Sequence, residues 1–388
     1  MAETHEVELT VGGRSLTAWD EVILTHDLLT AGSALTVTLW RGRQTPEMAA
    51  RARSVLQAFA PMEVRVDGAL QFVGTVERVR SGADREGAKL IVSGRDLSAA
   101  MLESDVDPLL SLKEITLFDA LTRAVAPLGL PLVVAATAED ARRIAAGKAH
   151  PRAPLKRATR RAHVDQWKPN PGEKVWAFCE GLARRHGFLL FVGPTAEGQG
   201  LILDKPAYGM EPIYDFARVA VPGTSPVAYE GNILAGWEDT NVTKVPTSVT
   251  AYAHTSLLEG EDAKAQAAQE NLALRSTRVR QGAPPRPRYV RDPRSRTLDH
   301  ARQKARDVIA RANQQLFTYE ATVQGWGQRE RGGLYTVNAM ATLRDDLEGI
   351  RGRALITKVD MRRSRAGGHT CALTLSPPGT IVLEPEES

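Results

Sequence analysis

Cysteine is scarce in this sequence, and no long apolar run is present. The chain of 388 residues has two cysteines, Cys179 and Cys371, which lie far apart and form no CxxC motif. A disulfide scaffold and a structural zinc site, which needs clustered Cys and His ligands, are therefore both disfavoured. The longest apolar runs, at 130–138 and 188–193, are far shorter than the roughly 20 residues of a membrane-spanning helix. We expect no stable membrane insertion and, because residues 1–6 lack a basic-then-apolar pattern, no secretory signal.

Catalytic motifs are also missing. The sequence contains no GxSxG, HExxH, GxxxxGK[ST] or GxGxxG pattern. Its 8 histidines are scattered, and none pairs with another at the spacing of a helical metal site. Asp345, Asp346 and Glu348 could ligate calcium, but they lack the glycine and the ligand spacing of an EF-hand loop. The sequence thus predicts no enzyme, no cofactor and no metal, and favours a role in binding or assembly.

Positive charge is concentrated in two segments. Residues 141–164 contain eight basic residues and no acid, and residues 275–296 contain eight arginines and one acid. The rest of the chain has 34 basic and 45 acidic residues, a net charge of −11. Such runs are most often solvated loops. The alternative is that a segment, through Arg157, Arg160 and Arg161, contacts an acidic surface of a neighbouring chain; a nucleic-acid site is less favoured, because DNA-binding domains carry a basic folded face.

Alternating apolar and polar residues predict a β-rich first domain. Its expected strands are 7–11, 35–39, 62–66 and 70–79. Asp67-Gly68 predicts a tight hairpin between the last two strands. One helix is expected between Thr45, a suitable cap, and Pro61, which would end it.

Helical signals alternate with strands further along the chain. Thr116 and Asp119 resemble a capping box for a helix that ends at Gly129, and a second helix is expected over 173–186. Alanine-rich residues 261–275 and an amphipathic stretch at 298–316 predict a helical insertion, with a Pro/Arg-rich loop between them. The expected domains are a first β domain at 1–100, a mixed α/β domain at 101–210, a second β domain at 211–260 and 317–388, and the helical insertion at 261–316.

The two β regions show a faint internal echo. Val73–Ser81 and Leu355–Ser364 are both long strand patterns that precede a polar turn and a shorter strand. Two interpretations have equal weight from these residues alone: a duplicated β unit, or a chance likeness between two hairpins.

A set of short motifs occurs in one order from about residue 5 to 383. The first pair is Asp67-Gly-x-x-x-Phe-x-Gly-x-Val76 with Leu90-x-Val-Ser-Gly-Arg-Asp96, and the second is Pro171-Gly-Glu-Lys-Val-Trp176 with Ala183-Arg-x-x-Gly187. Then follow Glu230-Gly-Asn-Ile-Leu234, Val323-x-Gly-Trp326, Gly333-Leu-Tyr-x-x-Asn338 and Leu355-Ile-x-x-Val359. In this order they resemble the baseplate hub proteins of Mu-like contractile-tailed phages, the late-control D family. The motif positions carried over as structural or interface residues are Gly74, Gly94, Arg95, Asp96, Trp176, Asn232, Trp326 and Asn338.

The resemblance implies a fold and a function. The implied fold is β-rich α+β, with two tube-protein-like β-barrel domains, an inserted α/β domain and a helical insertion, and this favours the duplication. The implied function is a homotrimeric hub that joins the tail tube protein to the central spike protein, contacts other baseplate proteins and passes DNA only in transit. Such a protein would be assembled in the bacterial host cytoplasm and end in the virion.

Two features depart from the family pattern or leave an alternative. Tyr335 stands where the family usually has Trp, and both basic segments look longer than is typical. The alternative function is the hub part of a type VI secretion or other contractile-injection spike complex. Those chains usually continue into a β-helical needle, which here would have to be a separate protein.

Overall fold

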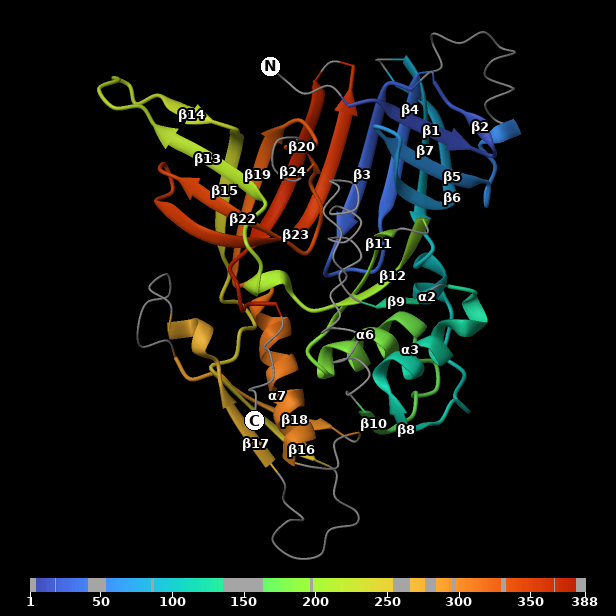
Figure 1. Ribbon diagram of the computed structural model, residues 1–388, viewed down its shortest axis with the longest axis vertical. Coiled ribbons are helices and arrows are strands. Elements are labelled where there is room, and N and C mark those ends of the chain that lie inside the picture. Colours follow the sequence, from blue (N-terminus) through green and yellow to red (C-terminus); the bar gives the residue numbers. More distant parts are fainter. Residues whose placement is uncertain are drawn as a thin grey trace, which may run out of the picture.

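One large sheet and two smaller α/β modules make up the structure. The computed structural model (Figure 1) describes residues 5–17, 19–40, 54–84, 87–130, 132–134, 163–195, 198–253, 266–275, 284–292, 294, 298–328, 333–365 and 367–381. The large sheet has 14 strands and occupies the upper part of Figure 1, with both modules below it. Its two parts are called the N-terminal and C-terminal β halves below.

The N-terminal β half confirms the strands expected before residue 100. Its strands are β1 (Val7–Val11), β2 (Arg14–Ser15), β3 (Glu21–Asp27), β4 (Ala34–Trp40), β5 (Pro61–Val66), β6 (Ala69–Asp84) and β7 (Gly87–Asp96). Asp67 and Gly68 join β5 to β6 with φ values of 50° and 78°, and the two-residue hairpin turn of type I′ needs positive φ at both positions. The helix expected after Thr45 lies largely outside the described residues.

The C-terminal β half contains the strands expected near the end of the chain. Its strands are β13 (Tyr214–Ala220), β14 (Tyr229–Gly231), β15 (Ile233–Thr240), β19 (Phe317–Gln324), β22 (Ala339–Asp345), β23 (Ile350–Ser364) and β24 (Gly368–Ser376). A small ribbon of β20 (Gly327–Gln328) and β21 (Gly333–Leu334) lies apart from the main sheet. The long strand pattern at Leu355–Ser364 and the shorter strand after its turn are confirmed as β23 and β24.

The two halves repeat one strand order. The N-terminal half reads β3-β4-β7-β6-β5-β1, and the C-terminal half reads β15-β19-β24-β23-β22-β13. The long strand of each half carries an irregularity at the same place, between Val76 and Arg78 in β6 and between Ile356 and Lys358 in β23. The last strand differs, because β1 runs antiparallel to β5 whereas β13 runs parallel to β22. The shared order and shared bulge support a duplication over a chance likeness.

One pair of strands joins the halves. The first part of β23 pairs with β22, and its second part, Lys358–Ser364, pairs antiparallel with β3. The buried apolar residues of both halves belong to one continuous core. The two β units expected as separate domains therefore share a sheet and a core.

The middle module packs around a second core. It contains α2 (Ala99–Glu103), β8 (Leu112–Thr116), α3 (Leu117–Val125), η2 (Ala126–Leu128), β9 (Leu132–Val134), β10 (His163–Trp167), α6 (Val175–Arg185), β11 (Leu189–Thr195), β12 (Gly198–Asp204) and η3 (Ala207–Gly209). The expected cap at Thr116 is confirmed, since its Oγ1 accepts a hydrogen bond from the Asp119 amide and donates one to the Asp119 carboxylate. The second helix stops before Gly187, whose φ is 77°.

The insertion module differs from the expectation. It contains β16 (Ser248–Ala253), β17 (Gln266–Glu270), η5 (Leu272–Arg275), β18 (Pro287–Asp292) and α7 (Leu298–Asn313). The helix expected at 261–275 is wrong over Gln266–Glu270, which pairs with β16 as a strand, and only Leu272–Arg275 is a short 3-10 helix. α7 covers this sheet through small side chains, Ala301 and Ala305 among them, which lie against Val249 and Ala251. β16 thus belongs to this module's sheet, although residues 211–260 were expected in the second β domain.

Candidate functional site

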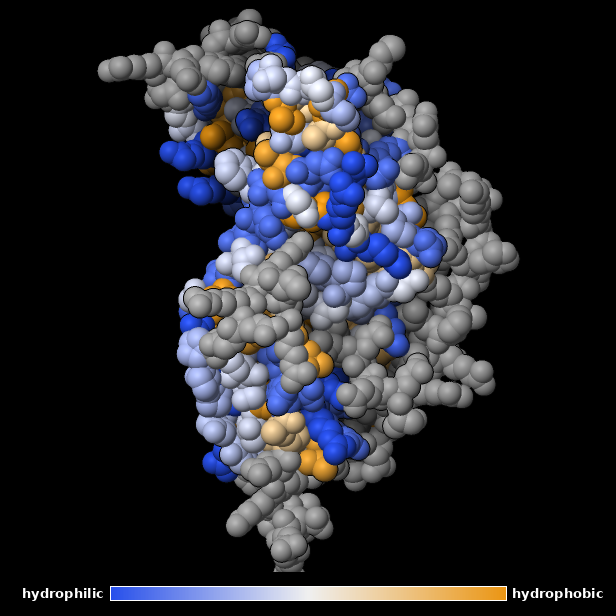
Figure 2. Space-filling view, turned by 90° about the vertical axis from the view of Figure 1, so that its left-hand side faces the viewer, coloured by the Kyte–Doolittle hydropathy of each residue, from blue (hydrophilic) through white to orange (hydrophobic). Residues whose placement is uncertain are grey.

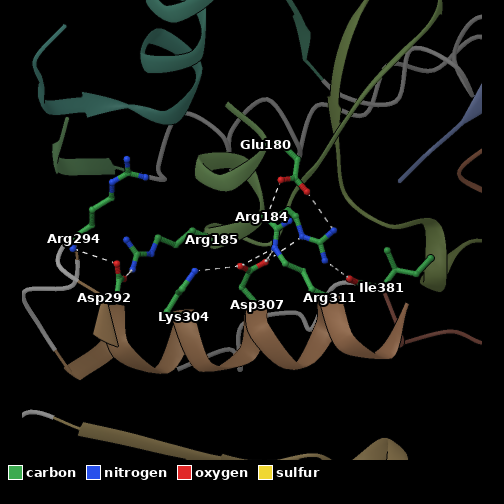
Figure 3. A network of polar contacts seen from close by, with 9 residues as sticks. All are labelled: Glu180, Arg184, Arg185, Asp292, Arg294, Lys304, Asp307, Arg311 and Ile381. Atoms are coloured by element: carbon green, nitrogen blue, oxygen red, sulfur yellow. Dashed lines mark hydrogen bonds and ion pairs between the residues drawn. The ribbon is translucent and has the colours of Figure 1, made fainter. Parts of the chain in front are cut away.

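A network of charged side chains joins the middle module to the insertion module. Glu180, Arg184 and Arg185 project from α6 toward α7, and Lys304, Asp307 and Arg311 project from α7 toward α6 (Figure 3). Nε of Arg184 donates to Oδ1 of Asp307 at 3.1 Å, and both side chains are buried. Nη2 of Arg184 donates to the carbonyl oxygen of Ile381 at 2.7 Å, which ties the end of the described chain to the same helix.

Arg311 extends the network on the solvent side. Its Nε lies 3.1 Å from Oδ2 of Asp307, and its Nη2 donates to Oε2 of Glu180 at 2.7 Å. Lys304 lies 3.8 Å from Oδ2 of Asp307. Burial acts to lower the pKa of Arg311, but the nearby Asp307 and Glu180 carboxylates outweigh it and raise the pKa. The Arg311 guanidinium therefore keeps its charge within the network.

A second cluster surrounds Trp167, next to the first along α6. Arg185 forms a buried ion pair with Asp292, and its guanidinium lies 4.7 Å from the ring centroid of Trp167. Arg294 lies 4.8 Å from the same centroid, and its Nη2 lies 2.5 Å from Oε2 of Glu173. Burial lowers the pKa of Arg185, and Asp292 opposes that shift. Both guanidinium groups make cation–π contacts with the Trp167 ring, which stabilise this cluster.

This cluster corrects the expectation for part of the second basic segment. Residues 287–292 and 294 are not a solvated loop, because Pro287–Asp292 is strand β18 and Arg294 is held within the chain by Glu173. The other expected contact residues, Arg157, Arg160 and Arg161, lie outside the described residues.

A third polar cluster lies inside the C-terminal β half. The guanidinium of Arg218 donates to both carboxylate oxygens of Asp345, at 2.8 and 2.5 Å, and the hydroxyl of Tyr319 donates to the same carboxylate. Burial acts to raise the pKa of Asp345, but the hydrogen bonds from Arg218 and Tyr319 outweigh it and the pKa is lowered. Burial and the hydrogen bond to Asp345 raise the pKa of Tyr319. Asp345 also accepts from the amide of Leu347, so it is a structural anchor for the turn after β22.

Gly74 and Gly94 lie at the crossing of β6 and β7. A Cβ at Gly74 would lie 2.1 Å from the carbonyl oxygen of Arg95, and one at Gly94 would lie 2.1 Å from that of Thr75. The backbones of the two strands therefore approach too closely for any side chain. Nε of Arg95 pairs with Glu77 at 2.6 Å, across the bulge of β6.

Asp96 ties the end of β7 to the loop before β4. Its buried carboxylate accepts from the amide of Ser33 at 2.5 Å and from the amide of Ser98 at 2.9 Å. Burial raises the pKa of Asp96 in spite of these bonds. Its role is to close the N-terminal β half beside the middle module.

The remaining motif residues also bind backbone groups or pack in a hydrophobic core. Asn232 brackets β13, since its Oδ1 accepts from the Ala217 amide at 2.8 Å and its Nδ2 donates to the Asp215 carbonyl at 2.7 Å. Trp326 is fully buried, and its Nε1 lies 3.0 Å from the carbonyl oxygens of both Arg362 and Thr370. Trp176 is buried in the core of the middle module.

Asn338 links the middle module to the C-terminal β half. Its φ is 55°, a conformation that few residues other than Gly and Asn adopt readily. Oδ1 accepts from the Ala207 amide at 3.0 Å, and Nδ2 donates to the Lys205 carbonyl at 3.0 Å. The motif therefore marks a joint between modules.

A cleft of about 770 Å³ lies between the insertion module and the C-terminal β half. Arg306 and Asn313 of α7 line one wall, and Tyr319, Arg353 and Leu375 line the other. Figure 2 shows the recess at the waist of the molecule on this side. In the described part of the chain no group of three His, Cys, Asp or Glu residues could hold a metal ion. No helix of that part is long and apolar enough to cross a bilayer.

Sequence reasoning found the motif residues but not the charged junction. Arg184 lies within the "Ala-Arg-x-x-Gly" motif, yet its partner Asp307 is 123 residues away, and nothing local signals the pair. Arg218 and Tyr319 lie in ordinary strand patterns, and Asp345 was weighed only as a calcium ligand. The α6–α7 network holds the middle and insertion modules in fixed relative positions, because each of its carboxylates is matched by a guanidinium. The Arg218–Asp345 pair acts within the C-terminal β half.

Comparison with known proteins bears on the first domain and on the whole fold. Residues 6–96 match the family model described as Mu phage baseplate assembly protein GpP-like, N-terminal. The comparison with curated proteins returned no match. The N-terminal β half thus has the sequence pattern of a Mu baseplate protein domain.

Solved structures resemble the chain over nearly its full length. A tail protein from Neisseria meningitidis MC58 has a TM-score of 0.73 at 20% identity, over 99% of this chain and 100% of that one. The 43 kDa tail protein of prophage MuSo2 from Shewanella oneidensis has a TM-score of 0.71 at 16% identity, over 97% of this chain and 99% of that one. The E. coli c3393 protein, described as a component of the type VI secretion system, has a TM-score of 0.50 at 12% identity, over 97% of this chain and 79% of that one. The fold is that of phage tail proteins.

Proposed function

We propose that this chain is the structural hub of a contractile phage tail baseplate. Three copies would form a ring that adapts a hexameric tail tube to a trimeric spike and encloses part of the DNA channel. The observation that carries the proposal is the repeated strand order of the two β halves. Because each chain has two equivalent units, three chains supply six, and one ring can match both symmetries.

The polar clusters support a structural role. Buried ion pairs at Arg184–Asp307 and Arg185–Asp292 fasten the modules, and the Arg218–Asp345 pair stiffens the C-terminal β half. Each of these pairs is satisfied within the chain. A component that transmits force between tube and spike needs such fixed joints.

The charge distribution also suits a DNA channel. Outside the two basic segments the chain carries a net charge of −11. A surface that bound phosphate would slow DNA in transit, since each Lys or Arg contact adds to non-specific affinity. An acidic body avoids this.

The experiment is to determine the mass and the location of the protein. Light scattering of the purified chain should give three times the 42.2 kDa of one copy, with larger complexes when tube and spike proteins are added. Particles made without the gene should lack assembled baseplates, and a complementing copy should restore them. A stable hexamer of this chain, or normal tails in its absence, would overturn the proposal.

A second candidate is the hub of a type VI secretion or similar injection spike. It is favoured by the likeness to c3393 and to a chain of the Francisella PdpA-VgrG complex, the latter at a TM-score of 0.53 and 8% identity over 100% of this chain and 60% of that one. Fractionation separates the two functions. Recovery with sheathed, DNA-filled particles supports the phage hub, and contact-dependent release into neighbouring cells supports the secretion hub.

A further inference from the structure

The junction between the two β halves has a counterpart with no strand partner in the described structure. Within the chain, β3 pairs with Lys358–Ser364, the second part of β23. By the repeated strand order, β15 corresponds to β3, and the second part of β6 corresponds to that of β23. In the described residues, β15 pairs on one side only, with β19, and β6 pairs with β5 no further than Thr75.

We propose that β15 of one copy pairs antiparallel with residues 78–84 of β6 in a second copy, repeating the β3–β23 junction between chains. The proposal deepens the trimer put forward above and rests on it. It names the contact surface: the outer edge of β15 on one side and the free edge of β6 on the other.

Alignment of the two bulges sets the register of this contact. Matching Val76 to Ile356 places Val79 at the position of Val359 and Arg80 at that of Asp360. Following the ladders outward from β24 through β19 places Asp239 at the position of Thr25. In the internal junction Thr25 and Asp360 face each other, and Oγ1 of Thr25 donates to Oδ1 of Asp360 at 2.6 Å. The equivalent pair between chains is Asp239 with Arg80.

That pair is complementary in charge. Asp239 and Arg80 are both exposed, and neither forms an ion pair with another described residue. Opposite charges directly across an antiparallel ladder stabilise the pairing, and like charges oppose it. The chain therefore carries the two signs on the two edges that the repeat brings together.

Shape and exposure agree with this register. Trp237 is 72% exposed on β15, and the register places it opposite Gly82, where a Cβ would have no atom within 4 Å. An aromatic ring can cover the backbone at a strand glycine. Val79 is 39% exposed, whereas its equivalent Val359 is fully buried because β3 and its half cover it.

The face that carries β15 shows the apolar surface such a contact would cover. In Figure 2, which looks onto the side of β13, β14 and β15, hydrophobic residues lie among hydrophilic ones over the upper lobe. Leu234 and Trp237 are exposed on β15 itself. An uncovered strand edge with exposed apolar side chains is an aggregation hazard, and pairing with another strand removes it. A second copy would supply the β6 edge that repeats this chain's own β3–β23 junction.

Charge reversal tests the pair. Arg80→Glu and Asp239→Lys should each raise the concentration for half-assembly by about tenfold or more, because every junction of a ring is weakened at once. The double variant should return to within about threefold of wild type, since the charges are exchanged across the same contact. Arg302→Glu, in an exposed pair on α7, is the matched control and should assemble normally. Mass photometry and sedimentation velocity give the readout.

Disulfide formation tests the register. Facing residues of an antiparallel ladder have Cα atoms about 4.5–5.5 Å apart, within reach of a disulfide. A chain with both Arg80→Cys and Asp239→Cys should give covalent trimers on oxidation, and one with Arg302→Cys and Asp239→Cys should give none. The native Cys179 and Cys371 are buried and should not interfere.

The outcomes separate this contact from the proposed function. Monomers at all concentrations, oligomers without the disulfide, or single charge variants that assemble like wild type would overturn the contact. Tails that contain the protein while the disulfide fails to form would leave the hub function standing and remove the contact. Disulfide-linked trimers that never enter tails would support the contact and overturn the hub function.

Discussion

Nε of Arg184 on α6 and Oδ1 of Asp307 on α7 lie 3.1 Å apart in a buried ion pair that joins two modules. The contact is almost free of solvent, with side-chain exposures of 3% and 8%. Loss of one partner would therefore leave an uncompensated charge in a place that water cannot reach.

Asp307→Ala tests the strength of this joint. It should lower the free energy of unfolding by about 3 kcal/mol, because Arg184 and Arg311 then lose their shared carboxylate. Asp299→Ala, which removes an exposed pair with Arg302 on the same helix, should cost less than about 1 kcal/mol. Urea unfolding measures the loss of stability in both variants. Equal losses would show that the buried pair contributes no more to stability than the exposed one.

Trp326→Ala should destabilise the C-terminal β half. The side chain is fully buried and donates to two carbonyl oxygens, so we expect a loss of about 3–5 kcal/mol. Trp237→Ala is the matched control, because that ring is 72% exposed and its removal should change the stability of one chain by less than about 0.5 kcal/mol. A Trp326→Ala variant that melts like wild type would contradict the core role.

Asn338 offers a way to separate backbone strain from hydrogen bonding. Asn338→Gly keeps the positive φ but loses the bonds to Ala207 and Lys205, and should cost about 1–3 kcal/mol. Asn338→Ala loses the same bonds and adds the strain of a left-handed residue, so it should cost about 1 kcal/mol more. The thermal midpoints of the two variants give the comparison, and a more stable Ala variant would refute the strain.

His26 predicts a dependence of stability on pH. Burial lowers the pKa of its ring to about 4, although Asp360 acts to raise it, so the folded chain holds the neutral form. The unfolded chain, with a pKa near 6.5, binds the extra proton between about pH 6.5 and 4. Stability is therefore lost as the pH falls through this window, by about 3 kcal/mol from this residue.

The measurement compares wild type with His26→Gln in urea at several pH values. The difference between the two proteins isolates the histidine from the many carboxylates that also titrate. The variant should lose less stability than wild type between pH 7 and 4. Parallel curves would mean that the folded ring is protonated as easily as the unfolded one.

Local signals explain which parts of the fold were predictable. Asp67-Gly68 and the Thr116–Asp119 cap act within four residues, so their structures follow from their own chemistry. Residues 266–270 were expected to be helical because Ala and Gln favour helices, but pairing with β16 overrides that weak preference. The sequence motifs identified the motif residues, but not the residues that bind them in the folded chain.

Distance along the chain limited the prediction of the candidate site. Arg184 and Asp307 meet only because α6 and α7 pack together, and Arg218 meets Asp345 only because β13 runs beside β22. Neither the helix contact nor the strand pairing leaves a residue spacing or a periodic pattern in the sequence that would predict it. The pairing of β3 with β23 was equally hidden, since each strand reads as an ordinary edge.

The β3–β23 pairing also orders events at the ribosome. The bond between Thr25 and Asp360 spans 335 residues, so β3 is made long before the strand that completes it. At roughly 5–20 residues per second, the growing chain waits about 17 to 67 seconds for that partner. During this time β3 is an open edge to which another nascent chain on the same message could add a strand. Shielding by a chaperone, or slow initiation that spaces ribosomes apart, would therefore raise the yield of correctly closed protein.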